Sequence, residues 1–114
     1  MQSLERGRFI ENDDQKNGLL NVLADDYCRQ IINQIMEEKK SAVQISQQTG
    51  IPPSTVYRKI MIMSNLKLLK TSGIISQEGK KIFLYQSKIK SVNAKFECGF
   101  INMEIIPNSF TSNL

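Results

Sequence analysis

Apolar residues recur every three or four positions in three successive segments of the chain, and this spacing predicts three helices. The first helix is predicted over residues 25–40, the second over residues 42–49 and the third over residues 53–66. The apolar residues expected on their buried faces are Tyr27, Cys28, Ile31, Ile32, Ile35, Met36, Val43, Ile45, Val56, Ile60 and Met63.

Residues that favour helix ends stand at the boundaries of these segments. Asp25 and Ser41 precede the first and second helices, where a side-chain oxygen can accept from the free N–H groups of the first turn. Gly50 closes the second helix, because glycine adopts the left-handed conformation at low cost. Pro53 suits the first position of the third helix, where a missing N–H costs nothing. The second and third helices are therefore predicted to be joined by a tight turn.

Two β-hairpins are predicted after the helices. A two-residue turn at 78–79 pairs Ile75 with Ile82, and both faces of this hairpin are apolar. A second turn at 98–99 starts a hairpin with a cleaner alternation of apolar and polar residues. Its expected pairs on the apolar face are Phe96 with Ile101, Ala94 with Met103, and Val92 with Ile105. Lys95, Asn93, Asn102 and Glu104 fall on the polar face, so one side of this hairpin is expected to be buried.

Neither end of the chain shows a periodic apolar pattern. Residues 1–17 and 107–114 are predicted to be flexible tails, and one folded domain is predicted over residues 18–106. A total of 114 residues is enough for one such domain. The apolar patch at residues 19–23 is interrupted by polar residues too often to predict a helix of its own.

The composition argues against an enzyme and against a metal site. The chain has no histidine, no glycine-rich phosphate loop and only two distant cysteines, Cys28 and Cys98. Each cysteine is expected to be a reduced thiol in a small apolar site, and a disulfide between them is the less favoured alternative. No apolar run is long enough to span a membrane, and the polar N-terminus does not resemble a secretory signal. The sequence therefore predicts a cytoplasmic protein without a cofactor, a metal or a membrane partner.

The net charge of +4 is distributed unevenly along the chain. Residues 54–95 hold nine lysines and arginines but a single acid, Glu78, and so carry +8. Residues 1–53 and 96–114 each carry −2. A segment this one-sided favours binding to a polyanion. The alternative interpretation is a lysine-rich surface that only meets solvent.

The order of three helices followed by a basic hairpin resembles the winged helix-turn-helix fold, an α+β architecture. The residues that carry this resemblance are "AVQISQQTGIPPSTVYRKIMIMSNLKLL". Ser46 takes the place of the small residue that lets the two helices pack closely, and Gly50 takes the place of the turn glycine. Ile51 and Val56 supply the apolar contacts. The C-terminal hairpin is additional to the three helices and the wing.

Archaeal regulators related to the arsenic-repressor-like family are the nearest resemblance. There, "STVYR" opens the recognition helix and a segment similar to "GKKIFLY" forms the returning strand of the wing. This chain departs from the family in three ways. Lys67 stands where many members have glycine, a hairpin replaces their terminal dimerising helix, and their metal-binding residues are absent. Metal sensing and the family's dimer geometry are therefore not implied.

The resemblance implies that the start of the third helix enters the major groove of DNA. The residues placed there are Ser54, Thr55, Tyr57 and Arg58, with Lys59 toward the DNA backbone. Lys80 and Lys81 lie at the hairpin tip, which contacts phosphates or the minor groove in this fold. The alternative for the helix residues is an ordinary exposed face, and for the two lysines a solvated turn.

The sequence thus predicts a sequence-specific DNA-binding transcriptional regulator whose partner is double-stranded DNA. A homodimer is expected, because most regulators of this kind read two half-sites. Residues 19–23, the first helix and the outer faces of the hairpins are the candidate dimer surfaces. The alternative function is a winged-helix module that binds another protein in a transcription-related assembly. The +8 segment favours the DNA-binding function, since a protein-binding module does not require it.

Overall fold

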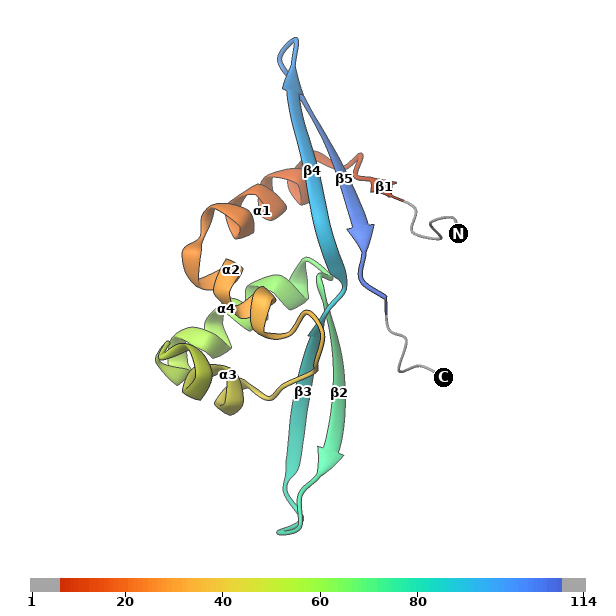
Figure 1. Ribbon diagram of the computed structural model, residues 1–114. Helices are drawn as coiled ribbons and strands as arrows, with labels where there is room; N and C mark the ends of the chain where they lie inside the picture. The colour runs from red at the N-terminus through yellow and green to blue at the C-terminus, as the bar shows by residue number, and fades with distance from the viewer. Residues whose placement is uncertain (1–6, 110–114) are drawn as a thin grey trace.

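The computed structural model describes residues 7–109, which form a helical body and two projecting hairpins (Figure 1). The helices are α1 (Asp13–Ala24), α2 (Asp26–Gln34), α3 (Ala42–Thr49) and α4 (Pro53–Asn65). The strands are β1 (Arg8–Phe9), β2 (Leu69–Ile75), β3 (Lys81–Ser87), β4 (Ile89–Glu97) and β5 (Phe100–Pro107). They form a β2–β3 sheet and a second sheet of order β1-β5-β4, both antiparallel.

The N-terminal segment is ordered from residue 7, so the predicted tail at 1–17 is wrong over residues 8–17; residues 1–6 lie outside the described range. Strand β1 pairs with β5, and the Ile10 N–H donates to the carbonyl of Met103 at 3.0 Å. Helix α1, which was not predicted, buries Leu19 and Val22. Gly18 weakens its helical pattern, but a side chain at that position would collide with Leu66. Close packing against Leu66 therefore favours glycine at position 18. With α1, the described chain has four helices rather than the three predicted.

Helix α2 begins as predicted and ends six residues early. The Asp25 side chain accepts from the Cys28 N–H at 3.2 Å and caps the helix. The helix ends at Gln34 because the chain then turns to pair with β3. Lys40 and Tyr85 exchange two backbone hydrogen bonds of 3.0 and 2.8 Å. Tertiary pairing thus overrides a helical pattern at residues 36–40.

Helix α3 has the predicted ends, and α4 begins as predicted and ends at Asn65, one residue early. Ser41 and Gln44 form a capping box, in which each side chain accepts from the backbone N–H of the other residue. Gly50 closes α3 with a φ of +79°. Val43, expected to point inward, is 52% exposed, so the buried face of α3 is narrower than predicted.

The β2–β3 hairpin differs from the prediction by one residue in register. Ile75 pairs with Lys81 instead of Ile82, because the loop has three residues, 77–79, rather than two. The Ser76 N–H donates to the Lys80 carbonyl at 2.7 Å, and Gly79 has a φ of +83°. This is the hairpin class in which a turn is followed by a left-handed glycine. A slip of one residue moves every side chain to the opposite face.

The β4–β5 hairpin pairs Phe96 with Ile101, in the predicted register. Cys98 and Gly99 both have positive φ, +55° and +82°, which fits a two-residue turn of the primed type. Cys98 is therefore exposed at the hairpin tip, and the expectation that it fills an apolar site is wrong. Cys28, in contrast, is buried, and burial raises the pKa of its thiol.

The predicted C-terminal tail at 107–114 is wrong at its first two residues. Strand β5 extends to Pro107, and the Asn108 amide donates to the carbonyls of Met36 and Ser87 at 2.6 and 2.9 Å. These bonds tie the end of β5 to the segment that follows α2 and to β3. Residues 110–114 lie outside the described range.

The core lies where the helices meet the bases of the two hairpins. Its fully buried large side chains are Leu19, Val22, Ile31, Ile35, Ile45, Val56, Met63 and Met103. The hairpins leave this core in opposite directions (Figure 1). The radius of gyration is accordingly 15.3 Å, against about 13 Å for a compact domain of this length. Each hairpin therefore presents a free end.

A lysine occupies the left-handed position that closes α4. The Leu68 N–H donates to the Met63 carbonyl and the Lys67 N–H to the Ser64 carbonyl, the two bonds of a Schellman motif. Lys67 has a φ of +62°, at the place where the resembling family has glycine. Side chains other than glycine are strained there by about 1–2 kcal/mol.

We predict that Lys67→Gly raises the free energy of unfolding by about 0.5–1 kcal/mol, since relief of strain exceeds the added chain entropy. Urea denaturation measures this change. Lys67→Ala is the control, because it removes the charge but keeps the Cβ, and it should give no such gain. A Lys67→Gly protein no more stable than the Ala variant would show that the position is unstrained.

Candidate nucleic-acid interface

Helix α4 presents a mixed exposed face opposite its buried face. Val56, Ile60 and Met63 are buried against the core. Among the predicted site residues on this helix, Ser54, Tyr57 and Arg58 are exposed and Thr55 is half-buried. Met61, one turn beyond Tyr57, is 64% exposed. The outer face thus combines hydroxyl groups, one guanidinium and apolar surface.

Arg58 is the cation of α4 that stays available to a ligand. Within residues 7–109, its guanidinium makes no hydrogen bond or ion pair with another side chain. Arginine binds guanine edges and phosphates through two parallel hydrogen bonds. Arg58 therefore has both the exposure and the chemistry of a nucleic-acid contact.

Lys59 has a structural partner. Its ammonium donates to the Asp25 carboxylate at 2.5 Å, and both side chains are largely covered. Asp25 also caps α2, so this single carboxylate joins the start of α2 to α4. The hydrogen bond from Lys59 lowers the pKa of Asp25. The predicted contact of Lys59 with nucleic acid remains a prediction, and it would require this ion pair to open.

The wing contributes Lys80 and Lys81, both exposed. Lys80 lies at the end of the loop, where its backbone N–H donates to the Ser76 hydroxyl at 3.1 Å. The ammonium of Lys81 lies 5.2 Å from the centre of the Phe83 ring. The Lys81 chain passes over Gly73, since a Cβ there would lie 3.0 Å from its Cε. The hairpin thus holds Lys81 along its surface rather than beyond its tip.

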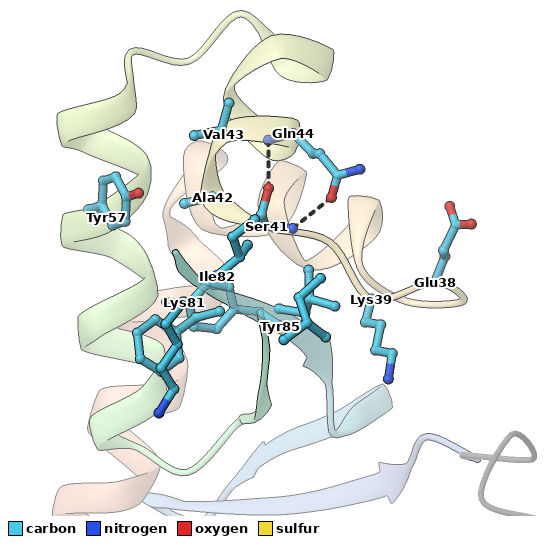
Figure 2. A pocket seen from close by; sticks show the side chains of 13 residues that line it. Glu38, Lys39, Ser41, Ala42, Val43, Gln44, Tyr57, Lys81, Ile82 and Tyr85 are labelled. Carbon is cyan, nitrogen blue, oxygen red and sulfur yellow. Dashed lines mark hydrogen bonds between the residues drawn. The ribbon is translucent and has the colours of Figure 1, made fainter. Parts of the chain in front are cut away.

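An open groove of about 850 Å³ lies between α3, α4 and the wing (Figure 2). Tyr57 of α4, Val43 of α3 and Lys81 of β3 are on three sides of it, and Lys39 lies at its rim. Phe83, Tyr85 and Ile74 add further apolar surface. The groove brings together two of the predicted site residues, Tyr57 and Lys81. Ser54, Thr55, Arg58, Lys59 and Lys80 lie outside its lining.

The sequence analysis missed the apolar part of this groove. Val43, Ile74 and Phe83 are each about half exposed, at 52%, 47% and 47%. Their spacing matches that of core residues, so no periodic signal distinguishes them. These three side chains are seen to face a groove only when the register of the wing and the position at which α2 ends are known. Lys39 was missed because it was placed in a helix that ends earlier.

The basic segment is divided between the two ends of the molecule. Lys81 lines the groove, and Arg58 and Lys80 each follow or precede a lining residue in the sequence. Lys88 lies between the two hairpins, and Lys90 and Lys95 lie on β4. The +8 of the sequence therefore does not form one continuous patch. Fewer than half of the basic residues of this segment lie at the groove or next to it in the sequence.

Comparisons with known proteins identify the fold. No protein-family model matches the chain, and no curated protein matches its sequence. The crystal structure of NolR from Sinorhizobium fredii is similar, with a TM-score of 0.58 and 15% sequence identity. The match covers 68% of this chain and 73% of the NolR chain. The chain therefore has a winged-helix-like α+β fold.

Membrane-spanning helices and metal-binding clusters are both absent from the part of the chain that the structure describes. In residues 7–109, no helix is long and apolar enough to cross a membrane. In the same range, no group of three or more cysteine, aspartate or glutamate side chains is placed to hold a metal ion.

We predict that Lys59→Met lowers the free energy of unfolding by about 1 kcal/mol at pH 7, because the pair with Asp25 is lost while the aliphatic stem is kept. The folded-state pKa of Asp25 is lowered, so the pair stabilises the fold above the ordinary carboxyl pKa of about 4. This stability is lost as the pH falls through the folded pKa. Denaturation of both proteins between neutral and acid pH tests this, and a difference that persists in acid contradicts it.

Proposed function

We propose that this protein is a sequence-specific DNA-binding transcriptional regulator. The observation that carries the proposal is that α4 and the wing flank one groove, with Arg58 exposed on the helix and Lys81 held along the wing. A helix of this kind enters the major groove of duplex DNA with its first turns against the bases. The wing then follows the backbone beside it.

Each exposed residue of the proposed interface has a distinct task. Arg58 binds a guanine edge or a phosphate, and Ser54 and Thr55 donate to phosphate or base. Tyr57 and Met61 supply apolar surface for thymine methyls and sugars. Lys80 and Lys81 neutralise phosphates from the wing. The apolar groove receives the sugar edge of the strand between the helix and the wing.

The fold comparison supports this kind of function. NolR is a winged-helix transcriptional regulator, and the similarity to it at 15% identity covers 68% of this chain. The closer resemblance to archaeal arsenic-repressor-like regulators, the cytoplasmic location and the homodimer remain proposals. Two copies would place two recognition helices on half-sites about one helical turn apart.

A second candidate function is supported by the apolar lining of the groove. Half-exposed Val43, Ile74 and Phe83 fit a protein segment as well as they fit sugars. In this case the protein is an interaction module of a transcription-related assembly. Salt dependence separates the two functions, because phosphate contacts release counterions and apolar contacts do not.

We predict that the protein binds duplex DNA with an affinity that falls steeply with salt. Replacing Arg58 and Lys80 together by alanine removes two phosphate-directed cations. The slope of log affinity against log salt should become shallower by about 0.9 for each lost contact, or about 1.8 in total. Fluorescence anisotropy of a labelled duplex over a salt series measures both slopes.

A matched control replaces Arg8 and Lys95, which are exposed on the β1-β5-β4 sheet, and removes the same charge. Its slope should equal that of the wild type if the contacts are local. An equal loss of slope in both double variants would mean that only net charge matters. Absence of binding at about 50 mM salt would contradict the DNA-binding function and favour the protein-interaction module.

A further inference from the structure

The free half of the β4–β5 hairpin carries large apolar side chains that the rest of the described chain, residues 7–109, does not cover. Near its base, Met103 and Ile105 are buried under the helices. Toward the tip on the same face, Phe96 is 73% exposed and Ala94 is exposed as well. Apolar and polar residues thus alternate along the whole hairpin, as they do in a half-buried strand. The helices, however, cover only its base (Figure 1). An exposed apolar face of this kind marks an interaction surface.

A shallow apolar groove lies at the other end of the same strand. Leu23, Ile32, Met36, Ile89 and Val92 line it, between the ends of α1 and α2 and the base of β4. Its volume is about 280 Å³. A cavity of about 150 Å³ lined by apolar groups holds benzene, so this groove has room for one phenyl ring.

The edge of β4 lies between these two features. In the described chain, β4 pairs with β5 on one side and with no strand on the other. Phe96 lies four residues from Val92, and Ala94 lies midway between them on the same face. Four residues of strand span about 13 Å. A two-fold axis near Ala94 therefore brings each Phe96 over the groove of another copy.

The charges of the projecting hairpin do not suit a polyanion. Residues 92–104 carry Lys95, Glu97 and Glu104, a net charge of −1. The single cation, Lys95, already pairs with Glu97 at 3.1 Å. A polyanion is thus an unsuitable partner for this hairpin, whereas a second copy offers an apolar groove to its exposed apolar face.

We infer that this surface is the contact between two copies of the chain: Phe96 of each copy enters the apolar groove at the base of β4 of the other. The contact is reciprocal, as two-fold symmetry requires. A stable interface buries about 800 Å² on each partner, which one hairpin tip does not provide. The reciprocal contact uses two patches per copy. The inference rests on the proposed homodimer and leaves α4 and the wing, at the other end of the molecule, accessible.

The test compares two phenylalanines on opposite faces of one hairpin. Phe96 and Phe100 are 73% and 72% exposed, so either can be replaced by aspartate at little cost to folding. Sedimentation equilibrium without DNA should give the wild type twice the 13.0 kDa mass of one chain at micromolar concentration. Phe96→Asp should raise the dimer dissociation constant about 30-fold or more, the loss typical of a central anchor. Phe100→Asp should leave it unchanged.

A second variant addresses the groove. Met36→Glu places a charge in the lining opposite the ring and should weaken the dimer as Phe96→Asp does, with circular dichroism confirming the fold. A monomeric wild type would overturn the inference, as would a dimer that resists Phe96→Asp or dissociates with Phe100→Asp. Because the mass is measured without DNA, a monomeric result would not contradict the salt-dependent DNA binding. In the same way, absence of DNA binding would not contradict a dimer formed through Phe96.

Discussion

The turn between α3 and α4 is the constraint on which the rest of the site depends. The Ser46 hydroxyl donates to the Ile51 carbonyl at 2.6 Å, and the Ile51 N–H donates to the Thr49 hydroxyl at 3.2 Å. Ile51 itself is buried, and Gly50 supplies the left-handed residue that reverses the chain. These bonds fix the angle between the two helices. Because that angle is fixed, Val43, Tyr57 and the wing meet at one groove.

Local chemistry made this part of the fold predictable. Capping residues, a glycine after a helix and a proline at its first position act within a few residues, and the ends of α3 and α4 follow from them. The β4–β5 register follows from its two-residue turn for the same reason. The register of the wing could not be predicted in this way, because Gln77 extends its loop to three residues and both faces of the hairpin are apolar. With no polar face to set the register, the turn decided it.

Tertiary contacts decided what the sequence did not reveal. Helix α1 has a weak amphipathic pattern and is held by packing around Leu19 and Val22. Residues after Gln34 leave the helix to pair Lys40 with Tyr85. Of the predicted site, Tyr57 and Lys81 both line the groove, and Arg58 is exposed on α4, whereas Lys59 is held by Asp25. Charge along the sequence could not show this, since an ion pair 34 residues apart has no local signal.

We propose that the outer face of α4 and the wing form one DNA-binding surface. Amide chemical shifts of the ¹⁵N-labelled protein, recorded during titration with a duplex, test it most directly, because they report each element separately. We expect the shifts to change in the first turns of α4 and around Lys80 and Lys81, and to stay constant at the tip of β4–β5. Changes centred on Phe96 and its neighbours, or none at all, would contradict it.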